Sequence, residues 1–184
     1  MTKIEYKLRK FRKTDADSIV KYANNEKIAK WLTNEFPHPY SKEDAEFFIN
    51  SISKENPTNT FAIEINKEAA GAITVAPQMK IIATSKKENT FLQINICDKQ
   101  GGFGYWLAEK YWNNGIMTSV IKEIVNYGFE TFDINCIYAT PFAGNIASQR
   151  VLKKAGFTSD LEKKNILKKD EIYESYVYSI KKLK

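Results

Sequence analysis

The chain has 184 residues and a mass of 21.2 kDa, a size that fits one domain and would be cramped for two. Hydrophobic residues make up 43% and charged residues 27%, so disorder and collagen-like repeats are excluded. The excess of 28 Lys and Arg over 22 Asp and Glu leaves a charge of +6, which suggests an anionic ligand without requiring one.

Cysteine and histidine usage argues against metal chemistry and a disulfide framework. Cys97 and Cys136 each lie in an apolar, strand-like run without CxxC spacing, which predicts two buried thiols in a reducing compartment. His38 is the only histidine, so no metal site is expected. Residues 1–12 contain no apolar signal core, and no stretch reaches the length of a membrane span. We therefore expect a cytoplasmic protein with no metal and no membrane attachment.

In chain order, the first half predicts two helices followed by strands. Thr14 and Ser41 are candidate N-caps, each ahead of acidic residues and helically spaced apolar residues. Between them, residues 36–40 contain two prolines and cannot be helical. Period-two alternation at residues 60–65 and a run at 71–75 predict a hairpin, and 78–89 is ambiguous. Two further strands are expected at residues 91–96 and 103–107, around a Gly101-Gly102 turn.

The second half alternates helices with strands. An apolar helical stripe runs from Met117 to Val125 and fades near Gly128. A second helix runs from Asn145 to a glycine C-cap at Gly156, after a buried strand at residues 136–139. A hairpin of residues 161–167 and 172–180 completes the chain. The order predicts a mixed α/β sheet flanked by helices, in one domain spanning residues 1–184.

The segment from Gly104 to Thr118 predicts an anion cradle. A strand ends, a polar turn containing Gly115 follows, and a helix begins. The free backbone N–H groups at a helix start, with the positive end of its dipole behind them, suit a phosphate, which Gly115 would allow to approach closely. An ordinary strand–helix turn explains the same local pattern. The segment is neither a P-loop nor a GxGxxG fingerprint.

A second segment, Asn145 to Phe157, combines an Asn, a Ser three residues later and a helix that ends in Ala-Gly-Phe. By itself, Asn145 could be only an N-cap and Ser148 only a polar residue of the first helical turn.

Together the two segments resemble the GCN5-related N-acetyltransferases, and within them the RimJ/RimL-like group that acetylates ribosomal-protein N-termini. The resemblance covers almost the whole chain and implies acetyl-CoA as co-substrate, bound in a cleft where two parallel strands splay apart. It implies that the pyrophosphate rests on backbone N–H groups and that the pantetheine arm adds like a strand. The residues implied to bind the cofactor are Tyr105, Trp106, Leu107, Trp112, Asn113, Asn114, Gly115, Ile116, Met117, Thr118, Asn145 and Ser148.

The resemblance also implies the groups that act on the thioester. A backbone N–H near Leu107 could stabilise the oxyanion. Many members protonate the departing sulfur with a Tyr; here that position is Leu152, and Ser148 matches the substitute proposed in this group. Asn145 would hydrogen-bond the pantetheine arm or a water.

The base is open, because Gly102 stands where the group usually has Glu. Water relayed by backbone, Asp98, Glu174 or Tyr178 could serve, or the amine could arrive neutral.

Acceptor specificity is less clearly encoded. The resemblance suggests an aromatic acceptor groove of Trp31, Phe36, Tyr40 and Tyr178, although core and loop packing would explain the same residues. His38, between two prolines, is expected at the surface.

The first hypothesis is therefore direct acetyl transfer to a primary amine, of a protein N-terminus or of a small molecule, by a monomer or homodimer. The alternative is an acyl-CoA-binding or regulatory module of the same fold that has lost the chemistry. Direct nucleic-acid binding is disfavoured, because no basic stripe interleaves with aromatic residues.

Overall fold

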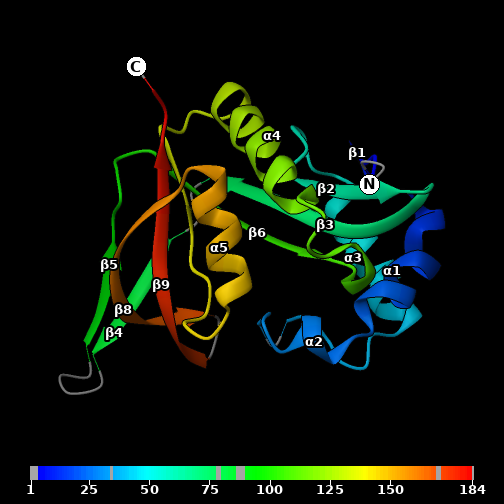
Figure 1. Cartoon of the computed structure of the whole chain (residues 1–184), viewed down its shortest axis with the longest axis horizontal. Coiled ribbons are helices and arrows are strands. Elements are labelled where there is room, and N and C mark those ends of the chain that lie inside the picture. The colour runs from blue at the N-terminus through cyan, green and yellow to red at the C-terminus, as the bar shows by residue number, and fades with distance from the viewer. Residues whose placement is uncertain (1–3, 34, 78–79, 86–89, 169–170, 184) are drawn as a thin grey trace. The chain divides into compact units, whose positions relative to one another are not determined.

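The computed structural model describes residues 4–33, 35–77, 80–85, 90–168 and 171–183 (Figure 1). Its strands form one sheet in the order β1-β2-β3-β6-β7-β9-β8-β4-β5. Strands β6 and β7 run parallel, whereas neighbours such as β1–β2, β7–β9 and β4–β5 are antiparallel, so the sheet is mixed, and helices flank it. Contacts divide the chain into two compact units, Met1–Thr74 with Gly104–Val120, and Val75–Phe103 with Ile121–Lys184.

The first unit contains the predicted N-terminal helices and the first hairpin. Its elements are β1 (Lys7–Arg9), η1 (Lys13–Asp15), α1 (Ala16–Ala23), α2 (Glu26–Ala29), α3 (Lys42–Ile52), β2 (Thr60–Ile65), most of β3 (Glu68–Pro77), the end of β6 (Gln100–Leu107), η2 (Glu109–Tyr111) and the start of α4 (Ile116–Thr131). Helices α1 and α3 lie side by side (Figure 1) and share a core that includes Ile19, Ala45 and Ile49.

Of the two predicted helix starts, one is confirmed and one is wrong. The Ser41 hydroxyl accepts a hydrogen bond from the Asp44 N–H at 3.1 Å, so Ser41 caps α3. Thr14 lies inside the 3-10 turn η1, and α1 begins at Ala16. This turn forms because the Asp15 carboxylate accepts the Arg12 N–H at 2.7 Å.

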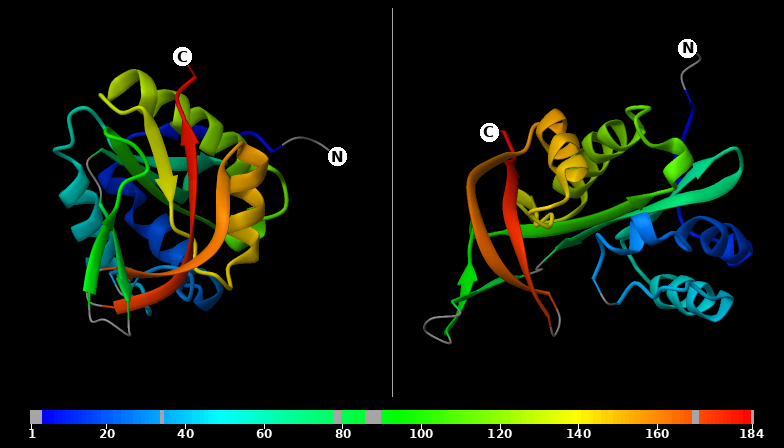
Figure 2. Two further views of the ribbon diagram at one scale, coloured as in Figure 1. Left: turned by 90° about the vertical axis from the view of Figure 1, so that its left-hand side faces the viewer. Right: turned by 60° about the horizontal axis from the view of Figure 1, so that its bottom comes forward.

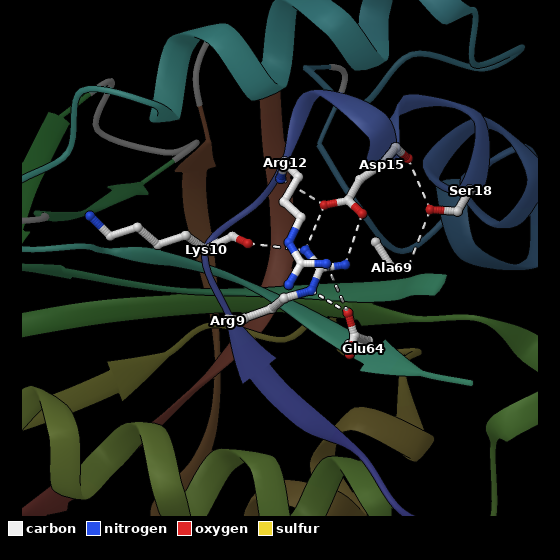
Figure 3. Close-up of polar contacts among 7 residues, drawn as sticks. All are labelled: Arg9, Lys10, Arg12, Asp15, Ser18, Glu64 and Ala69. Carbon is white, nitrogen blue, oxygen red and sulfur yellow. Dashed lines mark hydrogen bonds and ion pairs between the residues drawn. The ribbon is translucent and has the colours of Figure 1, made fainter. Parts of the chain in front are cut away.

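A buried ion network joins the start of the chain to the hairpin (Figure 3). The guanidinium of Arg9 donates two hydrogen bonds to Asp15, at 2.6 and 2.8 Å, and a third to Glu64. The Ser18 hydroxyl donates to the Asp15 carbonyl and accepts from the Ala69 N–H. The network therefore ties β1, α1, β2 and β3 together.

The second unit contains the remaining strands and α5. Its elements are the end of β3, β4 (Ile81–Ser85), β5 (Thr90–Ile94), the start of β6, most of α4, β7 (Cys136–Ala139), α5 (Ile146–Ala155), β8 (Thr158–Lys168) and β9 (Glu171–Lys181). Strands β8 and β9 form a long hairpin, and β4 pairs with β8 (Figure 2). The ambiguous segment 78–89 contains β4, while its residues 78–79 and 86–89 lie outside the described residues.

Three glycine predictions in this unit have different outcomes. Gly156 ends α5 at φ 101°, as predicted. The predicted Gly101-Gly102 turn is wrong, because both glycines lie inside β6, where a Cβ on Gly101 would meet Ile134 at 3.0 Å. Helix α4 continues through Gly128 to Thr131, since the missing Cβ lets the helix approach Ile137 and Val75.

The prediction of two free thiols is also wrong, because Cys97 and Cys136 form a disulfide. Two strand contacts bring them together. Gln100 of β6 is in register with Cys136 of β7, and the Asn135 N–H donates to the Lys99 carbonyl at 2.8 Å. The segment just before β6 therefore lies along the start of β7.

Candidate active site

The predicted anion cradle is an exposed turn in the first unit. Asn113 and Gly115 have positive φ angles of 62° and 74°, so the chain reverses tightly before α4. Trp112 and Asn114 hold the turn, because the Trp112 indole donates to the Leu107 carbonyl at 2.7 Å and the Asn114 amide donates to the Trp112 carbonyl at 2.8 Å. A Cβ on Gly115 would have no neighbour within 4 Å, so the backbone there is open to a ligand. Residues 112–115 are exposed, whereas Ile116 and Met117 anchor α4 in the core.

The turn is fastened to α1 and α2 through η2. The Glu109 carboxylate accepts hydrogen bonds from the Asn25 amide at 2.8 Å and from Lys27 Nζ at 2.5 Å. These contacts, that with Lys27 first, lower the pKa of Glu109. Lys110 Nζ donates to the Tyr22 hydroxyl at 2.6 Å and lies over the Tyr22 ring. The sequence did not indicate these contacts, because Asn25 lies 84 positions from Glu109 and Tyr22 lies 88 positions from Lys110.

Three aromatic residues predicted to bind substrate or cofactor meet in the same unit. Phe36 packs against Tyr40, with ring centres 4.9 Å apart, and against Trp106 at 6.0 Å. Tyr40 is buried, whereas Phe36 and Trp106 are half-buried. Trp31 is also half-buried and lies under Lys30 Nζ. Tyr105 and Thr118 are half-buried, and Leu107 is buried.

In the second unit, the parallel pairing of β6 and β7 is short. Its register covers Gln100–Gly102 and Cys136–Tyr138, although β6 continues to Leu107. The splayed pair expected from the resemblance requires such an early end to the pairing. Gly102 lies in β6. Because it is a glycine, no side chain is present at the position where the resemblance led us to expect Glu.

Asn145 and Ser148 are brought together at the start of α5. The Asn145 side-chain oxygen accepts the Ser148 N–H at 3.0 Å, which makes Asn145 the N-cap. Gln149 fixes the preceding loop, because its amide donates to the Ala143 carbonyl at 2.9 Å. Both Asn145 and Ser148 are half-buried.

The candidate bases named from the sequence are differently placed. Asp98 is exposed, and Glu174 is exposed and paired with Lys163 at 2.9 Å. Tyr178 is completely buried in β9, and burial raises the pKa of its phenol, which disfavours the phenolate at neutral pH. His38 is exposed, as expected.

The described residues hold no group of three or more His, Cys, Asp or Glu side chains that could bind a metal ion. Within that same part of the chain, no helix is both long and apolar enough to cross a membrane.

Comparison with known proteins agrees with this geometry. The model of the acetyltransferase (GNAT) domain matches residues 6–158. An N-acetyltransferase of Bacillus licheniformis, p20, is 26% identical over 184 residues, covering 95% of this chain and 92% of the relative. The microcin C7 self-immunity acetyltransferase MccE, solved with acetyl-CoA and AMP, aligns with a TM-score of 0.72 at 18% identity over 96% of this chain and 92% of its own. RimL, the ribosomal L7/L12 α-N-protein acetyltransferase solved with coenzyme A, aligns with a TM-score of 0.69 at 17% identity, over 96% of this chain and 93% of its own.

The parallel pair β6–β7, the glycine turn before α4 and the capped start of α5 all lie within the residues that the acetyltransferase domain model matches. The chain belongs to the GNAT acetyltransferase family, as the resemblance predicted. The protein is an acetyltransferase with acetyl-CoA as co-substrate. The open backbone at Gly115 fits a phosphate-bearing ligand.

Proposed function

We propose that this protein transfers the acetyl group of acetyl-CoA directly to a primary amine, in a ternary complex in the cytoplasm. The acceptor is a protein N-terminus or a small amine such as a polyamine, amino sugar or amino acid. The observation that carries the proposal is the cradle turn, whose positive-φ Asn113 and Gly115 present exposed backbone at the start of α4. The helix start is electropositive, which suits the pyrophosphate of acetyl-CoA.

In this proposal Trp112–Thr118 bind the cofactor, and Tyr105 to Leu107 offer backbone groups to its pantetheine arm. Asn145 and Ser148 act on the pantetheine and its sulfur. The amine nitrogen attacks the thioester carbonyl, the C–N bond forms, and the C–S bond breaks with its electron pair on sulfur. A hydroxyl has too high a pKa to donate its proton readily, so Ser148 would stabilise the sulfur by a hydrogen bond.

The aromatic residues of the first unit are proposed to contact the acceptor. Phe36 and Trp31 are half-buried and lie on the loop after α2, which Glu109 ties to the cradle turn. Tyr40 supports Phe36 from the core. Tyr178 is fully buried, so a role at the acceptor would require movement of the groups that cover it.

The proposal is tested by thiol release from acetyl-CoA in the presence of a panel of peptides, polyamines, amino sugars and amino acids. We expect turnover with at least one class, and Ser148→Ala to lower kcat about tenfold, the equivalent of one hydrogen bond, with acetyl-CoA affinity nearly unchanged. Ser51→Ala is the matched control, because Ser51 is exposed and its hydroxyl donates to the Phe48 carbonyl of its own helix. No thiol release with any acceptor would contradict the proposal.

Gly102 motivates the second candidate, an acyl-CoA-binding module without chemistry, because it leaves the expected base position without a side chain. Tight CoA binding measured by calorimetry, without turnover and unchanged by Ser148→Ala, would favour that module over the transferase.

A further inference from the structure

Lys168, the last residue of β8, reaches over the loop that joins β7 to α5. Its Nζ donates a hydrogen bond to the Thr140 carbonyl and lies 4.3 Å from the centre of the Phe142 ring. That ring stacks on Tyr173 of β9, with centres 4.3 Å apart and planes 7° apart. The amine is therefore held just after the C-terminal end of β7, at Thr140, which lies five residues before Asn145.

Among the described residues, the elements that contact this amine carry few ionisable side chains. In the described part of the chain, no carboxylate lies within ion-pair distance of Lys168 Nζ. Its cross-strand neighbour Glu171 accepts a hydrogen bond from the Tyr173 hydroxyl, and Tyr138 is the ionisable residue of β7. Loop residues 140–144 and β4 residues 81–84 carry no ionisable side chain. Burial lowers the pKa of Lys168 to about 8, so a useful fraction is neutral near physiological pH.

The amine also lies on the face of the sheet opposite to helices α4 and α5. Helices α4 and α5 cover one face of this unit, where Gly128 approaches Ile137 and Gly156 approaches Ile180. Lys168 belongs to the opposite face, where Ile166 packs in a buried cluster with Tyr138 and Val177. Tyr173 is in register with Ile166, and Phe142, the neighbour of Lys168, stacks on Tyr173. Ligands of open α/β sheets bind outside the carboxyl ends of parallel strands, and β7 ends directly before Thr140.

We propose that Lys168 accepts the proton of the acceptor ammonium group, an inference that rests on the proposed acetyl transfer. The proton passes from the ammonium to the neutral Nζ, and the freed amine attacks the thioester carbonyl. When the C–S bond breaks, the second N–H proton goes to the sulfur, and Lys168 returns its proton to solvent. Free CoA thiol, the amide and one proton in solvent are the products. In this proposal Lys168 takes the role of the base that Gly102, which has no side chain, cannot take.

The test uses kcat/KM between pH 6.5 and 10.5, with the best panel acceptor whose amine has a pKa of about 10. The variants are Lys168→Arg, which keeps a cation and donors but stays charged, and Lys168→Met. At pH 7.5 we expect both to lose about 100-fold, the usual size of general-base catalysis. Near pH 10.5 both should come within about tenfold of wild type, because the acceptor then loses its proton unaided. Lys163→Met, on the exposed side of the same strand, should follow the wild-type profile.

A purely structural role for Lys168 would lower activity by the same factor at every pH, and that result would overturn the proposal. Unchanged activity of both variants at pH 7.5 would overturn it as well. Calorimetry should show acetyl-CoA affinity within about twofold of wild type in both variants. NMR of protein with 13C-labelled lysine side chains, assigned through Lys168→Arg, should show a resonance titrating near pH 8; titration near 10.5 contradicts the inference. If wild type turns over no amine, the proposed function fails, whereas a pH-independent loss in the variants of an active enzyme overturns this inference alone.

Discussion

Loss of Asp15 should destabilise the fold strongly. Its side chain is 6% exposed and binds the 7% exposed Arg9 through two hydrogen bonds, the main cause of the raised pKa of the guanidinium. Asp15→Ala would leave Arg9 buried, with the Glu64 carboxylate and the Lys10 carbonyl as its remaining acceptors. We expect a loss of about 3 kcal/mol in the free energy of unfolding, measured by urea denaturation.

Asp17 provides the matched control, two positions along the chain. Its carboxylate is 79% exposed and pairs with Lys42 at 2.9 Å. Asp17→Ala should cost less than about 1 kcal/mol, because exposed ion pairs contribute little. Equal losses in the two variants would show that the buried network adds nothing beyond a surface pair.

Asn145 combines a structural role with a proposed functional one, and its two side-chain atoms separate them. The side-chain oxygen caps α5, while the amide N–H group is the donor proposed for the pantetheine arm. Asn145→Ala should cost about 1 kcal/mol of stability through loss of the cap. Asn145→Asp keeps the cap but not the donor, so its stability should match wild type while acetyl-CoA affinity falls about tenfold. Unaltered affinity in both variants by calorimetry would leave Asn145 as a cap alone.

Among the elements of the first unit, the close approach of β3 to β6 depends on Gly71. A Cβ at Gly71 of β3 would lie 2.5 Å from the Trp106 carbonyl oxygen of β6, a backbone atom that cannot swing aside. Gly71→Ala should therefore destabilise the protein by about 2 kcal/mol or more, the cost of overpacking. Gly104→Ala in β6 is the control, since its Cβ would meet nothing within 4 Å and its stability should stay within about 0.5 kcal/mol. Similar urea midpoints for both variants would contradict the packing argument.

The elements that the sequence predicted well are those specified by local chemistry. Ser41 and Asp44 form a capping box, and Gly156 has the left-handed conformation that ends α5. The errors occur where distant residues decide. The sequence Gly101-Gly102 indicates a turn. In the structure both glycines belong to β6, because they pair with β7 and Gly101 lies close to the side chain of Ile134.

The candidate site follows the same division. The cradle turn and the Asn145–Ser148 pair are each local, so their motifs could be recognised in the sequence. Lys168 ends β8 in a charged stretch that is typical of an ordinary surface strand, and its contact with Thr140, 28 positions away, distinguishes it.

At the scale of the whole molecule, the disulfide closes a long loop. Cys97 and Cys136 are separated by 39 positions, and a loop of this length would lose about 4 kcal/mol of unfolded-state entropy in the simple chain model. Reduction of the wild type should therefore lower the urea midpoint substantially. Cys97→Ser should unfold at the lowered urea midpoint both with and without reductant. A wild-type midpoint that reductant does not move would mean that the thiols are unpaired in solution.

The buried amine of Lys168 should make the free energy of unfolding depend on pH. The folded-state pKa of Lys168 is about 8, below its ordinary value of 10.5, because burial penalises the charged amine. Between these two values the unfolded chain holds a proton that the folded chain has released, so this group makes the free energy of unfolding rise with pH. The difference in that free energy between wild type and Lys168→Met should therefore increase from pH 8 to 10, measured by urea denaturation. Lys163 is the opposite case: its pairing with Glu174 raises its pKa, so the difference between wild type and Lys163→Met should not increase over the same range. A flat difference for Lys168→Met would show that its amine titrates like a solvated lysine, and would remove the reservoir of neutral amine that the proton-transfer step requires.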